Sequence, residues 1–260
     1  MMKRFFVIAL FVLGFGQLYA QPVRDTAWTK AGYFGLKLTQ VSLSSWSAGG
    51  ESALAFDSQI TYSADFKRDR QLWQNRLELG YGLTKNDGKS ARKTNDKIYF
   101  ASTYGYQIYK TLYWSALLNF NTQFAKGYDY NIEDSDFISK FMAPGYLMIG
   151  TGVTWSPNKI FTATFTPASW RGTIVADSRL SDEGAFGVDK GKHLLSEFGA
   201  NLKAEVNYEF LPNMKVYSRL ELYSNYLKDP QNIDVRWEVQ LNMAINKWFS
   251  TTLSTNLLYD

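Results

Sequence analysis

The chain has 260 residues, of which 45% are hydrophobic and 17% aromatic, and its formal net charge is +4. It contains no cysteine, which excludes disulfides, thiolate metal sites and cysteine nucleophiles. The 28 basic and 24 acidic residues are nearly balanced and form no basic block, so no nucleic-acid partner is expected.

The N-terminus has the layout of a secretory signal peptide. Lys3 and Arg4 precede the apolar stretch 5–15, and a small-residue end follows at 18–20. We therefore expect residues 1–20 to be a cleaved signal and Gln21 to begin the mature protein, which leaves a formal charge of about +2. No other run reaches about eighteen apolar residues, so no membrane-spanning helix is expected.

Apolar and polar residues alternate through most of the remaining chain. In one run Leu202, Ala204 and Val206 are separated by Lys203 and Glu205, and the same pattern recurs near 216–222 and 233–243. A period of two indicates extended strands with two unlike faces. Strands of ten or more residues with one apolar and one charged face are typical of an outer-membrane barrel, in which lipid meets one face and water or polar side chains meet the other.

Turn residues divide the chain into strands joined alternately by short and long connections. Short, Pro-, Asn- or charge-containing turns are predicted at 67–70, 109–111, 156–159, 211–213 and 245–247. Longer polar connections are predicted at 47–51, 85–96, 126–139, 171–192 and 228–231. The predicted strands are 31–46, 52–66, 71–84, 96–109, 111–125, 140–155, 159–170, 194–210, 213–227, 232–246 and 248–259.

The expected fold is all-β: an antiparallel up-and-down transmembrane barrel over 31–260, after a periplasmic lead at 21–30. Eleven strands starting from the periplasm put Asp260 on the outer side, whereas single-chain bacterial barrels have an even number. We therefore expect about twelve strands, the last lying beyond Asp260; the alternative is a miscount by one. Such an error would fall in the first strand, because its parity changes between Leu38 and Val41, which predicts a bulge near Thr39.

Tryptophans are predicted to form two girdles at the membrane interfaces, where indole rings prefer to lie. Four are next to short turns, on the periplasmic side, and two are next to long loops, on the outer side. In that order they are Trp73, Trp114, Trp155 and Trp248, then Trp46 and Trp170.

The inward face is predicted to carry a mixed network of charges, in which antiparallel neighbours have opposite signs. Its members are Lys203, Glu205, Lys215, Arg219, Glu221, Arg236, Glu238, Arg76 and Glu78. Two interpretations stay open: a salt-bridged interior that fills a narrow barrel, or a selective channel. A pore for anionic sugars should show a basic ladder of one sign, and this interior does not.

No catalytic, cofactor or metal site is expected. His193 is the only histidine; it falls in a long loop with Ser196 close by, and no Gly-x-Ser-x-Gly elbow occurs. Glu133, Asp134 and Asp136 fit no calcium-loop spacing. Gly49 and its neighbour form a hairpin tip rather than a phosphate cradle, since no helix follows.

Several sequence motifs resemble a family of uncharacterised secreted proteins from Bacteroidota, classed as a domain of unknown function. They are the W-x-x-G-G motif at 46–50, the R-K-T-x-D motif at 92–96 and the N-I-D-V-x-W-E motif at 232–238, together with the segments 138–146, 166–168 and 257–260. The resemblance covers nearly the whole mature chain. It implies an outer-membrane barrel that continues through polar residues to a closing strand, and it implies no catalytic or binding residue.

The expected function is that of a non-enzymatic outer-membrane barrel of structural or interaction type, either alone or as an accessory subunit of a larger envelope complex. Its expected partners are outer-membrane lipid and other envelope proteins, with the long loops outside the cell. The alternative is a small porin-like diffusion channel for a polar solute, and a distant third is an outer-membrane lipid hydrolase.

Overall fold

The structure is a computed structural model that describes residues 27–43, 50–132, 136–244 and 249–259. Nearly all of them belong to one antiparallel sheet of eleven strands in the order β1-β2-β3-β4-β5-β8-β9-β10-β11-β12-β13. The predicted all-β antiparallel fold is therefore confirmed, and so are the eleven strands predicted between residues 31 and 259. Among the described residues, no helix is long and apolar enough to span a bilayer.

The strand bounds follow the alternating segments of the sequence closely. They are β1 (Trp28–Val41), β2 (Ala53–Arg68), β3 (Gln71–Asn86), β4 (Arg92–Tyr109), β5 (Leu112–Thr122), β8 (Gly145–Trp155), β9 (Phe161–Ile174), β10 (Leu194–Leu211), β11 (Met214–Asn225), β12 (Ile233–Ala244) and β13 (Ser250–Tyr259). Since β1 already begins at Trp28, residues 28–30 of the predicted lead are strand. The predicted signal peptide lies outside the described residues.

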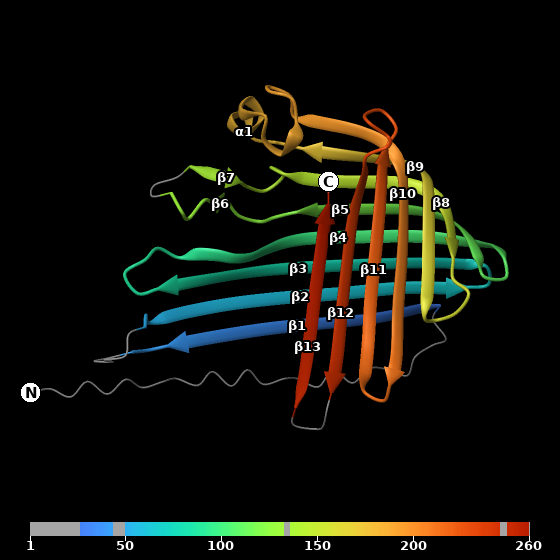
Figure 1. Ribbon diagram of the computed structural model, residues 1–260, viewed down its shortest axis with the longest axis horizontal. Helices are drawn as coiled ribbons and strands as arrows, with labels where there is room; N and C mark the ends of the chain where they lie inside the picture. The colour runs from blue at the N-terminus through green and yellow to red at the C-terminus, as the bar shows by residue number, and fades with distance from the viewer. Residues whose placement is uncertain (1–26, 44–49, 133–135, 245–248, 260) are drawn as a thin grey trace, which may run out of the picture.

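The sheet curls on itself, so that β10–β13 cross in front of β1–β5 (Figure 1). The long connections gather at one end of the curl and the short turns at the other (Figure 1). Within the described residues β1 pairs only with β2, and β13 only with β12. Because every neighbouring pair is antiparallel and the number of strands is odd, these two edge strands run in the same direction.

One strand departs from regular pairing where its sequence requires it. Pro167 lies inside β9 and has no backbone N–H, so it cannot donate to either neighbouring strand. The register of β9 shifts at this point against both β8 and β10, which is a bulge that leaves the proline out of the ladder. The bulge predicted near Thr39 is wrong: β1 pairs with β2 without a shift from Trp28 to Val41. Val41 is simply the last residue of the strand, next to a connection.

A small cap covers the long-connection end of β8, β9 and β10. It consists of the two-stranded ribbon β6 (Gly127–Tyr128) and β7 (Phe137–Ser139), the helix α1 (Ser178–Glu183) and the 3-10 turn η1 (Ala185–Gly187). Ala143, Val175, Leu180 and Val188 form its buried core. Asp177 accepts a hydrogen bond from the Leu180 N–H at the start of α1, and Gly184 ends the helix at φ 76°. These elements occupy the predicted connections 126–139 and 171–192, which are therefore not plain loops.

Candidate functional site: the two faces of the curled sheet

The pairing register sorts the strand side chains into one apolar and one polar face. Residues directly opposite each other across a sheet share a face. One apolar row crosses β2, β3, β4, β5 and β8, and each of its members is directly opposite the next: Tyr62, Leu77, Phe100, Phe120 and Leu147. On the other half of the sheet, Leu202, Val206, Val216, Leu220, Val239 and Leu241 share one face in the same way. The apolar face is thus continuous across the sheet.

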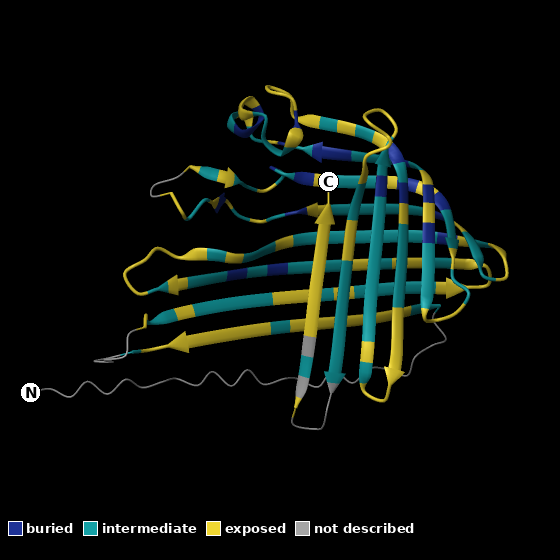
Figure 2. Ribbon diagram, in the orientation of Figure 1, coloured by how far each residue is buried: buried dark blue, intermediate teal, exposed yellow. Residues whose placement is uncertain are grey.

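The apolar face is the exposed one. Phe34, Leu36 and Leu38 on β1 are 66%, 55% and 68% exposed, and Leu253 on β13 is 62% exposed. Among the described residues, four of the five buried apolar side chains belong to the cap, and the fifth is Tyr223 of β11. Within the sheet the buried residues are otherwise small and polar, such as Ser115, Ser169 and Thr166. Figure 2 shows this exposure along the strands. The usual inside–outside distribution of a soluble protein is inverted here.

The polar face carries the predicted charges as a checkerboard on β10, β11 and β12. Arg219 is opposite both Glu205 and Glu238, and Glu221 is opposite both Lys203 and Arg236. Arg219 lies 2.5 Å from Glu238 and 3.9 Å from Glu221. Further pairs join Arg236 to Glu221 at 3.9 Å, Lys203 to Glu205 at 3.2 Å and Lys215 to Glu209 at 3.5 Å.

Arg76 and Glu78 form a second charge group on β3. Glu78 accepts from Arg76 and from Lys97 of β4, each at 2.5 Å. The two groups belong to opposite walls of the curl, because β11 crosses in front of β3 and β4 (Figure 1). The polar faces of the two halves therefore look toward each other across the interior.

Arg171 is a further member of this interior that is absent from the predicted charge network. It belongs to β9 rather than to the predicted connection 171–192, and its guanidinium forms two hydrogen bonds to Glu197 of β10 at 2.7 and 2.9 Å. It also reaches Asp234 of β12 at 3.0 Å and stacks 4.0 Å from the Tyr223 ring of β11. This cluster joins four strands on the inner face. Trp170 and Arg171 continue the apolar–polar alternation of the strand, and this pattern could have predicted that β9 extends through Arg171.

The tryptophans are placed mainly at the strand ends. Trp73, Trp114 and Trp155 lie at the short-turn end of β3, β5 and β8 and are 42%, 45% and 49% exposed. Trp170 lies toward the long-connection end of β9, where its indole donates to the Ser196 hydroxyl at 2.6 Å. Trp46 and Trp248 lie outside the described residues.

The residues considered for other chemistry are not assembled into a site. His193 places its Nδ1 2.7 Å from the Val175 carbonyl oxygen and thereby ties the cap to the end of β9. The Ser196 hydroxyl is engaged by Trp170. No group of three or more potential metal ligands occurs in the described part of the chain. Asp136 is exposed, and Glu133 and Asp134 lie outside the described residues.

Two family models match parts of this chain. A family described as "Protein of unknown function (DUF3078)" matches residues 38–128, and a family described as "Protein of unknown function, DUF481" matches residues 170–260. No curated protein matches the chain. The matches thus fall on β1 to β6 and on β9 to β13, and the chain resembles domains of unknown function at both ends of its sheet.

Proposed function

We propose that this protein is an outer-membrane β-barrel of structural or interaction type without enzymatic activity, with its long connections and cap outside the cell. The observation that carries the proposal is the inverted distribution of side chains: large apolar residues are exposed along the strands, while charged and small polar residues lie inside. In water such a surface would aggregate. Facing hydrocarbon it is the expected surface of a transmembrane barrel.

Strand length supports the same proposal. A barrel strand that crosses a bilayer at a tilt needs about 9–11 residues. The eleven strands of the sheet have between 10 and 18 residues. Trp73, Trp114 and Trp155 lie at one end of their strands, at the level at which indole rings meet lipid headgroups.

The interior favours a structural or interaction role over free diffusion. A diffusion channel needs an open polar lumen, whereas Arg171 is bonded to Glu197 and Asp234 and stacked on Tyr223. Arg219 and Glu238 are likewise paired with each other rather than free for a solute. In this proposal the ion pairs hold the barrel wall together, and partners meet the cap from outside or the apolar face from within the membrane.

Fractionation and conductance together test the proposal. The mature protein should begin at Gln21 and be recovered with the outer membrane, and it should give no steady single-channel steps in a planar bilayer. A mild-detergent pull-down then separates a free barrel from a subunit of a larger complex. An intact Met1 terminus or recovery in the soluble fraction would refute the membrane location, and steady conductance steps would favour the diffusion channel.

A further inference from the structure

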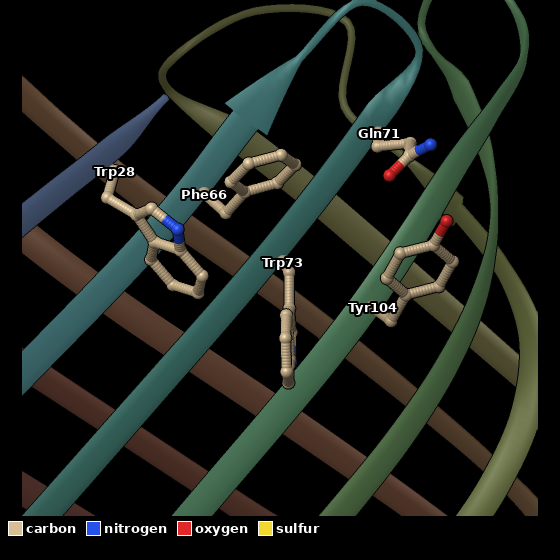
Figure 3. Close-up of a pocket in the computed structure, with 5 residues that line it drawn as sticks. All are labelled: Trp28, Phe66, Gln71, Trp73 and Tyr104. Carbon is tan, nitrogen blue, oxygen red and sulfur yellow. The ribbon is translucent and has the colours of Figure 1, made fainter. Parts of the chain in front are cut away.

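The short-turn end of the apolar face carries an aromatic groove. Trp28, Phe66, Trp73 and Tyr104 are directly opposite one another on β1, β2, β3 and β4. The Trp28 ring centroid lies 5.3 Å from that of Phe66 and 5.7 Å from that of Trp73. With Gln71 these residues line a hollow of about 520 Å³ (Figure 3).

Two arginines lie at the end of this groove that is next to the turn between β2 and β3. Arg68 is opposite Gln71, one position further along the same face than Phe66, and its guanidinium lies 5.9 Å from the centre of the Phe66 ring. Arg70, in the turn between β2 and β3, lies 5.1 Å over Tyr106, which is itself opposite Gln71. Both cations therefore border the aromatic surface.

Within the described part of the chain, these two cations have no carboxylate partner. Across the described ranges of the chain, neither Arg68 nor Arg70 forms an ion pair with a carboxylate; Arg70 donates only to the backbone oxygens of Gln107 and Ile108. This contrasts with Arg171 and Arg219 inside the sheet, which are paired. Lys67 near the end of β2 and the single acid Asp69 in the turn complete an excess of positive charge at this end of the hairpin.

We propose that this groove is a binding site for one anionic phospholipid of the adjoining leaflet. Arg68 and Arg70 would take the phosphate-bearing headgroup, since guanidinium groups bind phosphate oxygens with directed N–H donors. The upper acyl chains and the glycerol ester region would lie on Trp28, Phe66 and Trp73, because aromatic rings favour the boundary between headgroups and hydrocarbon. The inference rests on the proposed membrane location. It adds that the site binds an anionic phospholipid in the leaflet next to the short turns.

Charge complementarity selects this occupant over a zwitterionic lipid or an apolar protein surface. A zwitterionic headgroup carries a positive charge of its own, which would lie beside Arg68 and Arg70, two cations that have no carboxylate partner within the described residues. Each basic residue near an anionic lipid surface raises the affinity about fivefold. A protein partner with only apolar side chains would leave both guanidinium groups without a counter-ion.

Quenching by brominated lipids tests the site. The full mature protein is inserted into vesicles of one fixed mixture of phosphatidylcholine with a minor amount of phosphatidylglycerol. Two versions of this mixture are compared. In one, the acyl chains of the phosphatidylglycerol carry bromine near their carbonyl end. In the other, the same amount of phosphatidylcholine carries it instead. Subtracting the fluorescence of a W28F/W73F variant isolates the groove. We expect about fivefold or stronger preference for quenching by the anionic lipid.

Two matched variants separate the site from general surface charge. R68Q/R70Q should bring the two quenching values to equality, whereas K190Q/K192Q, which removes two exposed cations at the opposite end, should leave the preference unchanged. Native mass spectrometry of the detergent-purified wild type should also show one retained phosphatidylglycerol, which is lost in R68Q/R70Q. This second readout does not depend on the tryptophan variant folding.

The failures are distinguishable. Equal quenching by both lipids in the wild type, or a preference that survives R68Q/R70Q, would overturn the lipid site while leaving the barrel proposal intact. Absence of quenching by either lipid would show that the groove does not face a membrane, which would overturn both proposals.

Discussion

Arg219 shows how single charged residues hold the inner face together. Its guanidinium lies 2.5 Å from Glu238, and about one third of each side chain is exposed. An ion pair at this depth is neither fully screened by water nor fully desolvated. Its contribution to the free energy of unfolding therefore lies between those of a surface pair and a buried pair. The neighbouring Glu221, at 3.9 Å, provides a weaker second contact.

We predict that Arg219→Ala destabilises the protein by about 1–3 kcal/mol, because Glu238 then keeps its charge in a half-buried position without its closest partner. In a double-mutant cycle with Glu238→Ala, unfolding titrations should give a coupling energy of at least about 0.5 kcal/mol. The exposed pair Lys192–Asp189 is the control and should give nearly none. Additive effects at Arg219 and Glu238 would mean that the interior is open and hydrated.

Asp177 makes the cap sensitive to acid. Lys140 Nζ lies 2.5 Å from one carboxylate oxygen, and the Leu180 N–H donates to the other at 3.0 Å. The ion pair with Lys140, followed by the backbone hydrogen bond, holds the pKa of Asp177 below its usual value of about 3.8. The carboxylate therefore stabilises the cap above about pH 3.8, and this contribution is lost as the pH falls further, through the lowered pKa.

We expect amide hydrogen exchange across residues 175–193 to accelerate below about pH 3.8, after correction for the intrinsic effect of pH on exchange. In Asp177→Asn this segment should exchange faster already at neutral pH and should lose the acid-dependent step. Asp189→Asn, which removes an exposed acid of the same cap, should keep the step. A cap whose exchange profile is the same in wild type and Asp177→Asn would contradict the role of the Lys140 contact.

At the scale of the element, successive residues of a strand lie on opposite faces of the sheet. Val239 and Gln240 are neighbours in the middle of β12. Val239 is opposite Ser218 on the apolar face, whereas Gln240 is opposite Tyr217 on the polar face. The same substitution at these two adjacent positions therefore probes the two faces of the sheet separately.

We predict that Val239→Arg costs about 2–4 kcal/mol in a refolding titration into lipid vesicles, as a cation near the bilayer midplane does in a barrel. Gln240→Arg should cost much less, because it adds a cation to a face that already contains carboxylates. A one-residue error in register would exchange these outcomes. Equal costs at the two positions would show that β12 does not separate lipid from a polar interior.

The elements differ in how well the sequence predicts them. All eleven long strands were predictable, since a strand of ten or more residues repeats its apolar signal several times and is bounded by turn residues. The ribbon β6–β7 and helix α1 were not, because two to six residues give too few repeats to reveal a period. Asp177 and Gly184 were the only local signs of the helix, as its N-cap and C-cap.

At the scale of the whole molecule, assigning each strand residue to the apolar or the polar face predicts that charges far apart in sequence lie close together. Opposite signs at alternate positions of three consecutive strands were sufficient to predict the pairs around Arg219. The contact of Arg171 with Asp234 could not be predicted. It depends on how tightly the sheet curls, which is set by the accumulated twist of many strands rather than by any local pattern.

In the proposed membrane-inserted state, the two edge strands of the curled sheet would need a partner. The edges of β1 and β13 are unpaired within the described residues, and unsatisfied backbone groups in hydrocarbon cost several kcal/mol each. Both edges run in the same direction, so a single strand antiparallel to both would satisfy them. Phe34 and Leu38 on one edge and Leu253 on the other are already exposed on the apolar face that such a closed wall would continue.

In the proposed membrane-inserted state, the apolar face meets lipid and the charged face does not. Because the chain contains no cysteine, single cysteines can be placed and spin-labelled along β11 without background. In lipid vesicles, accessibility to oxygen should be high at positions 216, 220 and 222 and low at 217, 219 and 221, with a period of two along the strand. A flat profile, or one with its maxima on the charged positions, would contradict the account.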